Sequence, residues 1–504
     1  MLKTKAGSSV AHSAQSTTEV DLKKIKKKSL SGIISFFIRT VLLQVIGFVS
    51  ALILSAFLGP EEFGIYGIVT QIIALLIFFS DIGLASSLIQ EKKEPSREDY
   101  QTAFTVQQIL SWVICLVVLL LIHFSVFEQK IGQDGNYLLL ALAVSFPLAT
   151  LKTIPSIILT RKLEFDKLVL PQIFEQLVFH VVLIVLAWRG HGVMSYAYAS
   201  IARSLIGVVV MQLIQPWFSG LKIHKKSLKG LLNFGVKFQL NDFLARIKDQ
   251  LYFLVLGAYL PLDQFGYLQW SKNWSMYPYN LTVSNVMSIT FPTFSRLQNH
   301  PEVLKKAIEK SIYFISFAIF PILVGMSLFI QPLLTVFPRY AKWLPAVPSF
   351  IMFTLSVIWA AISTPLLNAL NAIGKINQTL KLMLFWTVLT WVLTPILIWF
   401  FGFNGVALAA LLISLTSILS VMLIKKYVSV TIWPNVNAQV VASLVMTVFA
   451  MAGMSIWTQS LTKLFFGLVL SGFSYLLTFY FLSGKRLFKE IQSIRNNLSK
   501  DKSQ

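Results

Sequence analysis

Fourteen long apolar segments follow one another along the chain and restrict its fold more than any other feature. A bilayer core needs about 20 predominantly apolar residues per helix, and these segments reach roughly that length. With 56% hydrophobic and 13% charged residues among 504, the chain is too apolar for a soluble enzyme of this size. The sequence therefore predicts an all-α polytopic membrane protein with about 14 transmembrane helices. The predicted spans are about 33–58, 64–90, 103–126, 137–160, 169–187, 193–215, 230–257, 264–295, 311–331, 344–371, 377–400, 405–424, 435–457 and 464–483.

The basic residues alternate between the two sides that these spans define. Loops on the side of the N-terminus hold 30 of the 43 Lys and Arg residues, and the opposite loops hold five. Cytoplasmic loops of membrane proteins carry such an excess, so both termini are predicted to be cytoplasmic. This distribution accounts for most of the net charge of +22 and argues against a nucleic-acid partner.

A short motif recurs in the two halves of the chain. Gly59-Pro60 separates two apolar segments, as in a transmembrane helical hairpin. The following Phe63-Gly64 returns 202 residues later as Phe265-Gly266. The sequence therefore predicts two repeated halves, each beginning with such a hairpin.

The two ends of the chain and its single cysteine carry weaker signals. Residues 1–32 are rich in Ser, Thr and Lys and lack the apolar core of a secretory signal, so a disordered basic cytoplasmic tail is expected. Residues 484–498 have apolar positions at helical spacing between basic ones, which predicts an amphipathic helix on the inner membrane surface. Cys115 lies within an apolar segment and is expected to be a buried small residue.

Four stretches resemble a known family. They are LGPEEFGIYGIVTQIIALLIFFSDIGLASSLIQ at 58–90, ILTRKLEFDKL at 158–168, FPTFSRLQNHPEVLKKAIEKS at 291–311 and LNALNAIGKINQTLKL at 367–382. Across about residues 30 to 430, the chain resembles the Wzx-type polysaccharide transporters. These are flippases for lipid-linked oligosaccharides within the multidrug/oligosaccharidyl-lipid/polysaccharide (MOP) exporter superfamily.

The resemblance implies an architecture and a substrate. It implies two six-helix lobes, 33–218 and 219–426, in a V-shaped MATE-like arrangement, followed by two additional helices at 427–483 and the tail 484–504. The implied substrate is an oligosaccharide on a polyprenyl pyrophosphate carrier in a bacterial cytoplasmic membrane. The implied partners are membrane lipids, a glycan polymerase and export machinery, and no cofactor is implied apart from Na⁺ or H⁺ as a coupling ion.

Basic and polar residues inside the predicted spans are the candidates for a substrate cavity. A charge at the bilayer centre costs at least ~2.5–3.5 kcal/mol, so it normally faces a watery cavity or a partner group. Lys and Arg there could bind a pyrophosphate, while Asn and Tyr could contact sugars. The alternative is that these charges pair between helices or lie near the membrane interface. The candidates are Arg39, Lys152, Arg203, Lys237, Lys248, Lys272, Asn273 and Tyr277.

Two acidic residues inside predicted spans are candidates for ion coupling. A carboxylate in a membrane can bind Na⁺ or carry a proton, and Asp81 and Glu175 are the two considered. Asp81 lies near a helix end, where it could instead serve only as a cap or a pairing group.

Three functions remain in competition on the sequence. A flippase is favoured because eight basic residues against four acidic ones lie inside the spans, which suits an anionic substrate. A cation-coupled drug or metabolite antiporter of the same superfamily would need a more acidic pocket. A membrane glycosyltransferase or polymerase is disfavoured because no predicted outer loop is long enough for an acceptor site. No catalytic or metal-binding motif is recognised.

Overall fold

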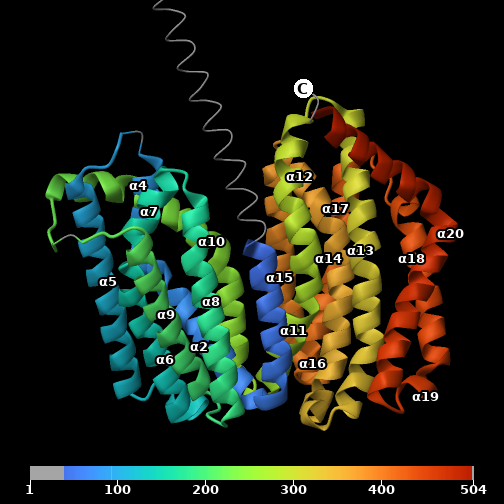
Figure 1. The fold of residues 1–504 in the computed structure, drawn as a ribbon, viewed down its shortest axis with the longest axis horizontal. Coiled ribbons are helices and arrows are strands. Elements are labelled where there is room, and N and C mark those ends of the chain that lie inside the picture. The colour runs from blue at the N-terminus through green and yellow to red at the C-terminus, as the bar shows by residue number, and fades with distance from the viewer. Residues whose placement is uncertain (1–38, 92, 219, 502–504) are drawn as a thin grey trace, which may run out of the picture. The chain divides into compact units, whose positions relative to one another are not determined.

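The computed structural model describes the backbone of residues 39–91, 93–218 and 220–501. Its description leaves out the side chains of residues 78, 234, 236–238, 240–250, 288–289, 491 and 493–501. The predicted tail 1–32 lies outside the described residues. Every regular element in the described part is a helix, which confirms the all-α prediction (Figure 1).

Contacts divide the chain into two compact units. Unit 1 comprises the described residues up to Leu58 together with Ile65–Tyr259, and unit 2 comprises Gly59–Gly64 and the described residues from Leu260 onward. The lobes that the resemblance implies, 33–218 and 219–426, are a division of the sequence rather than a division by contacts. Their boundaries therefore stay a prediction.

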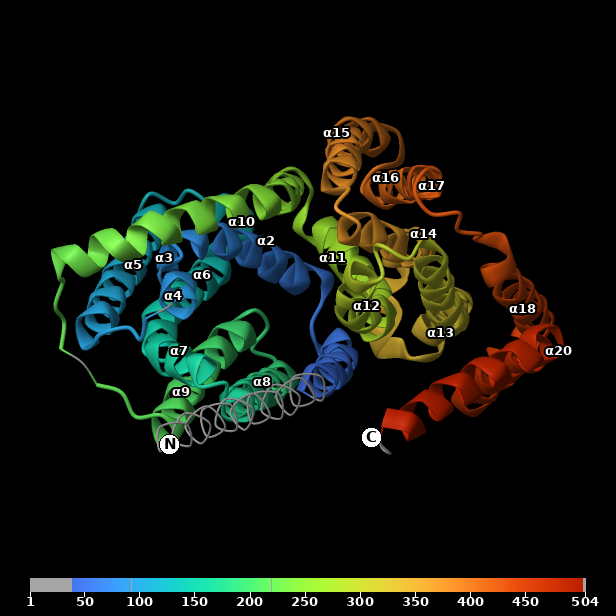
Figure 2. The ribbon, with the colours of Figure 1, turned by 90° about the horizontal axis from the view of Figure 1, so that it is seen from above.

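Unit 1 is a bundle in which the helix Arg39–Phe57 lies beside α8, and α10 lies against α4 and α5 (Figure 2). The largest contacts join α8 to α9 and α9 to α6. Its labelled helices are α2 (Pro60–Leu76, which begins in unit 2), α3 (Phe78–Asp81), α4 (Leu84–Gln90), α5 (Arg97–His123), α6 (Glu128–Thr150), α7 (Thr153–Arg161), α8 (Phe165–Trp188), α9 (Met194–Ile214) and α10 (Lys225–Tyr259).

Unit 2 is centred on two long helices, α13 and α14, which pack on each other. α18 packs on α13, and α11 and α16 pack on α14. Its helices are α11 (Leu262–Tyr279), a π-helix (Asn280–Ser284), α12 (Asn285–Arg296), α13 (Pro301–Val336), a 3₁₀-helix (Pro338–Ala346), α14 (Val347–Ala372), α15 (Ile376–Phe401), α16 (Asn404–Leu415), α17 (Ile418–Lys425), α18 (Trp433–Ala452), α19 (Met454–Trp457) and α20 (Leu461–Asp501).

Large apolar side chains cover the outside of many helices. Leu213, Trp399 and Phe481 are 77%, 81% and 76% exposed, respectively. In water such surfaces would drive aggregation, whereas a lipid environment accepts them. Ten helices in the described part are long and apolar enough to cross a membrane, and the bent pair α6–α7 would be an eleventh. The chain is therefore a multi-pass membrane protein, and the count of fourteen spans stays a prediction.

One predicted span is broken. The apolar segment 64–90 was expected to be one helix, but the structure divides it into α2, α3 and α4. Ile82 and Gly83 both adopt left-handed backbone conformations, with φ of 49° and 75°. Gly83 also lies against α10, where a Cβ atom on it would stand 2.7 Å from the carbonyl carbon of Gly235. A hydropathy profile cannot detect the left-handed conformations or the close approach, because both arise from backbone geometry.

The repeated glycines lie opposite one another within unit 2. A Cβ atom on Gly64 would stand 2.9 Å from the carbonyl carbon of Leu262. Reciprocally, a Cβ atom on Gly266 would stand 2.7 Å from the carbonyl carbon of Pro60. The starts of α2 and α11 therefore cross backbone to backbone, and only glycine allows this approach.

The C-terminal amphipathic segment is a continuation of α20 rather than a separate surface helix. Its first turn is fixed to the rest of unit 2, since Arg486 donates 3.2 Å to the carbonyl of Pro434 and lies over the ring of Tyr313. Glu490 forms a 2.6 Å ion pair with Lys310 of α13. These contacts hold residues 484–490 against the bundle.

Candidate functional site

A proline-induced break between α6 and α7 places Lys152 in the interior of unit 1. Pro155 has no N–H to donate to the carbonyl of Leu151, four residues earlier. The side chain of Gln212 on α9 donates to that carbonyl instead, at 3.1 Å. The two helices meet at 45°, and Lys152 stands at the bend as the residue preceding α7. The sequence therefore positions this lysine through a proline kink.

Pro147 in α6 also leaves a carbonyl without its helical donor, and a side chain of another helix satisfies it. Pro147 cannot donate to the carbonyl of Ala143, and the thiol of Cys115 on α5 donates to it at 3.2 Å. Cys115 is buried, as expected. Its thiol thus satisfies a carbonyl that the helix itself leaves without its usual donor.

A buried carboxylate joins two of the predicted basic residues. Glu175 on α8 is 6% exposed, and its carboxylate pairs with the ammonium of Lys152. Its second oxygen lies 3.8 Å from Nε of Arg203 on α9. Gly207, also on α9, makes room for the carboxylate, because a Cβ atom there would stand 2.7 Å from Cδ of Glu175. Three elements therefore meet at one ionic cluster.

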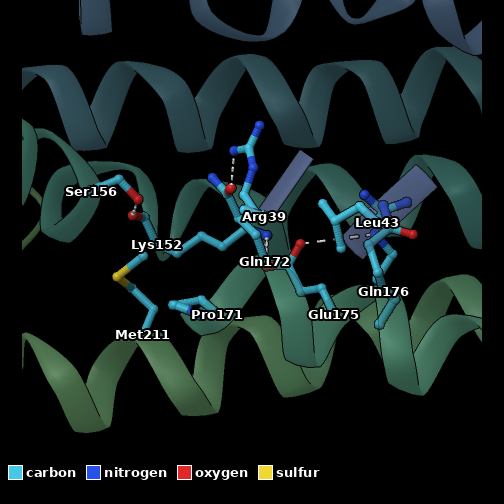
Figure 3. A pocket seen from close by; sticks show the side chains of 10 residues that line it. Arg39, Leu43, Lys152, Ser156, Pro171, Gln172, Glu175, Gln176 and Met211 are labelled. Carbon is cyan, nitrogen blue, oxygen red and sulfur yellow. Dashed lines mark hydrogen bonds and ion pairs between the residues drawn. The ribbon is translucent and has the colours of Figure 1, made fainter. Parts of the chain in front are cut away.

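A pocket of about 320 Å³ opens beside this cluster (Figure 3). Arg39, at the start of the described chain, reaches into it and donates to the side-chain oxygen of Gln172. The side chain of Arg203 is 42% exposed and that of Lys152 is 23% exposed. The lining residues are Arg39, Leu43, Lys152, Ser156, Pro171, Gln172, Glu175, Gln176, Arg203 and Met211.

The charges of this pocket favour an anion. Three basic side chains, Arg39, Lys152 and Arg203, line the pocket together with one carboxylate, that of Glu175. Arg and Lys make charge-assisted hydrogen bonds to phosphate oxygens, and Arg can do so with two parallel donors. Gln172 and Gln176 add neutral amides that can donate to and accept from hydroxyl groups. The pocket is equipped to hold a phosphorylated and hydroxyl-rich head group.

The structure brings together four of the predicted site residues: Arg39, Lys152, Arg203 and Glu175. Asp81 is elsewhere in unit 1, at the helix break, where its carboxylate accepts from the amide of Ala85 at 3.2 Å and from the side chain of Gln107. That arrangement fits the capping alternative, and ion coupling by Asp81 stays a prediction.

The other predicted residues lie on α10 and α11. The side chains of Lys237 and Lys248 are outside the described residues. On α11 in unit 2, Lys272 and Tyr277 are half-buried and Asn273 is exposed. Their role in binding stays a prediction.

Two tryptophans of α11, Trp270 and Trp274, are part of the packing of unit 2. Trp270 is 2% exposed and stacks on the fully buried Trp343, with ring centroids 5.0 Å apart. Trp274 is 8% exposed and lies beside Trp270. Burial leaves Trp270 little surface for a sugar, so this residue serves packing.

Sequence reasoning did not identify Gln172, Gln176 and Gly207. A signal for the two glutamines was present, because they are four residues apart, on either side of Glu175, in a largely apolar segment. Gly207 carried no such signal, since its part depends on which side chain of α8 faces it.

Solved structures share this fold. The lipid II flippase MurJ in an inward closed conformation superposes with a TM-score of 0.68 at 16% identity, over 90% of this chain and all of that one. An inward-facing MATE-family multidrug resistance transporter of the MOP superfamily gives 0.58 at 14% identity, over 79% and 98% of the two chains. The chain is thus a multi-pass membrane protein with the fold of these flippases and transporters.

Sequence comparison names the family. Residues 53–348 match the family model described as "Polysaccharide biosynthesis protein", and the chain belongs to this family, which confirms the predicted resemblance. The lipopolysaccharide biosynthesis protein WzxC of Escherichia coli K12 is 24% identical over 72% of this chain and 74% of its own length. The succinoglycan biosynthesis transport protein ExoT of Rhizobium meliloti is 21% identical over 68% of each chain.

Proposed function

We propose that the protein is a flippase that moves an oligosaccharide linked to a polyprenyl pyrophosphate across the cytoplasmic membrane. The observation that carries this proposal is the pocket of unit 1, with three basic side chains around one buried carboxylate, in a polysaccharide biosynthesis protein. The names of WzxC, ExoT and MurJ point in the same direction. Movement between leaflets needs no covalent change, so no enzymatic activity is proposed.

In this proposal the pocket holds the charged head of the carrier lipid. Arg39, Lys152 and Arg203 would bind phosphate oxygens, while Gln172 and Gln176 would contact the adjoining sugar. At about 320 Å³ the pocket is near the lower end of the size range of ligand sites, so it suits a head group and not the polyprenyl chain. The chain would remain in the bilayer. Alternating access, usual for transporters with internal repeats, would then present the head group to one side at a time.

The proposal includes an orientation and a driving force. Both termini would be cytoplasmic, because the basic loops alternate in that sense. A gradient of Na⁺ or H⁺ would drive transport, with Asp81 and Glu175 as the candidate coupling carboxylates. The product would then reach a glycan polymerase and the export machinery.

Thiol labelling tests the orientation. In a Cys115→Ala background, single cysteines at Lys130 and Arg339 should react with an impermeant thiol reagent on intact cells. Cysteines at Lys225 and Lys306 should react only after the membrane is opened. The reverse pattern would exclude cytoplasmic termini.

A deletion strain tests the flippase function. It should lack the surface glycan and accumulate the lipid-linked repeat unit on the inner leaflet. Arg203→Lys should restore part of the export, because Lys keeps the charge but loses the two-donor fork. Arg203→Glu, made at normal abundance, should restore none, while Lys426→Glu, at an exposed site outside the pocket, should restore it fully. A normal surface glycan in the deletion strain would refute the proposal.

A drug or metabolite antiporter is the second candidate, because MATE transporters share the fold. Export of cationic drugs would be served by an acidic pocket, whereas basic groups outnumber the carboxylate three to one here. The deletion strain should therefore be no more sensitive than its parent to cationic dyes. Increased sensitivity that the gene reverses, together with a normal glycan, would favour the antiporter.

A further inference from the structure

The carboxylate of Glu175 occupies the position that an incoming anion would be expected to take. It pairs with Lys152 and lies 3.8 Å from Arg203, which are two of the three cations of the pocket. The third cation, Arg39, donates to the side-chain oxygen of Gln172. Glu175 is 6% exposed, and the pocket opens beside it.

We propose that Glu175 is an internal counter-ion that holds the anion subsite when the pocket is empty and that the diphosphate of the substrate displaces it. This inference rests on the proposed function and adds a regulatory element to the same site. A bound diphosphate would take over Lys152 and Arg203, and the Glu175 side chain would move aside. When the diphosphate leaves, the carboxylate returns and prevents immediate rebinding.

Gly207 is the positioning residue of this device. A Cβ atom on Gly207 would stand 2.7 Å from Cδ and 2.8 Å from Cγ of Glu175, so the observed pose exists only because position 207 lacks a side chain. The atoms that meet it are the flexible end of a glutamate rather than backbone. An alanine there would therefore displace the carboxylate and leave the crossing of α8 and α9 in place.

An internal counter-ion serves a carrier for a physical reason. Two neighbouring, partly buried cations without a counter-ion would repel each other at a cost when the pocket is empty. The same two cations would bind a diphosphate tightly and release it slowly, whereas transport requires release on the far side. Glu175 removes both difficulties. Its carboxylate compensates the cations when the pocket is empty, and it lowers the affinity for the diphosphate because the substrate must replace an ion pair that already exists.

A purely structural role for Glu175 predicts the opposite effect on binding. If the carboxylate only orients Lys152 and Arg203 for the substrate, its removal leaves them less well placed and weakens binding. The sign of the change in affinity therefore distinguishes a competing carboxylate from a supporting one.

The test is a titration of the purified full-length protein with inorganic pyrophosphate, followed by calorimetry. Glu175→Gln keeps the size of the side chain and removes its charge. It should lower the Kd for pyrophosphate by about ten-fold or more, which corresponds to about 1.4 kcal/mol. Glu302→Gln removes the same charge from an exposed position and should leave the Kd unchanged.

Gly207→Ala supplies the second variant, because it displaces the carboxylate without changing the charge of the protein. It should also lower the Kd, and it keeps the test decisive if Glu175→Gln does not fold. In export assays, tighter binding in either variant should accompany slower transport.

The outcomes separate this inference from the proposed function. Equal or weaker pyrophosphate binding in both variants, with binding intact in the parent protein, would overturn the counter-ion role and leave the flippase proposal standing. Absence of pyrophosphate binding in the parent would overturn both the counter-ion and the anion pocket. The flippase function itself is decided by the surface glycan of the deletion strain.

Discussion

Alanine in place of Gly266 should destabilise unit 2 by forcing two helices apart. Its Cβ atom would stand 2.7 Å from the carbonyl carbon of Pro60, nearer still to the carbonyl oxygen, and 3.1 Å from the amide nitrogen of Gly64. These neighbours are backbone atoms and cannot rotate away. Since carbon atoms in contact prefer about 3.5–4.0 Å, the starts of α2 and α11 would have to separate by roughly 1 Å.

The magnitude follows from two opposing effects. Overpacking of a close contact typically costs about 1–3 kcal/mol. Alanine is also a better helix former than glycine by about 0.8–1.0 kcal/mol, which offsets part of that cost. The difference between these two effects is a net loss of up to about 2 kcal/mol of stability for Gly266→Ala.

The matched control is Gly472→Ala. Gly472 lies within α20, and a Cβ atom there would have no atom within 4 Å apart from the neighbouring backbone of its own helix. Only the helix-propensity gain applies, so this variant should be as stable as the parent or more so. Thermal unfolding midpoints in detergent, followed by tryptophan fluorescence, should rank Gly472→Ala above the parent and the parent above Gly266→Ala.

The reciprocal variant tests whether the two glycines share one interface. Gly64→Ala would place its Cβ atom 2.9 Å from the carbonyl carbon of Leu262 and should be destabilising in the same way. Once one alanine has separated the helices, the second should cost less, so the double variant should lose less than the sum of the single losses. Strict additivity, or a Gly266→Ala protein as stable as Gly472→Ala, would refute the close crossing.

Further substitutions test three particular sets of contacts. Gln212→Leu leaves the carbonyl of Leu151 without its 3.1 Å donor and should cost about 1–3 kcal/mol, whereas adding Pro155→Ala should recover much of the thermal midpoint by restoring a backbone donor. Trp343→Ala removes a fully buried ring and should cost about 3–5 kcal/mol, measured by chemical unfolding. Arg161 donates to four backbone carbonyls at and after the end of α4. Because Lys lacks the guanidinium fork, Arg161→Lys should speed proteolytic cleavage of the segment that follows α4. An unchanged cleavage rate would mean that these hydrogen bonds do not hold the segment.

The candidate site was only partly visible in the sequence. Lys152, Arg203 and Arg39 could be recognised because a charge is costly inside an apolar segment. Their shared pocket could not, because hydropathy assigns a residue to a helix and not to a face that meets another helix. Glu175 was considered for ion coupling by itself, and its pairing with Lys152 appeared only when α7, α8 and α9 were packed together.

The sequence by itself determined the class of the molecule. A segment that crosses a bilayer must satisfy every backbone polar group internally, and apolar segments of about 20 residues do so as helices. The sequence also contains the prolines that bend α6–α7 and the glycines of the repeat. Tertiary structure alone decided what those residues do: Gln212 satisfies the carbonyl freed by Pro155, Gly266 faces Pro60, and Gly207 admits the carboxylate of Glu175. The physical reason is that periodicity reports the surroundings averaged along one helix, whereas each of these contacts joins atoms of two helices at a single crossing.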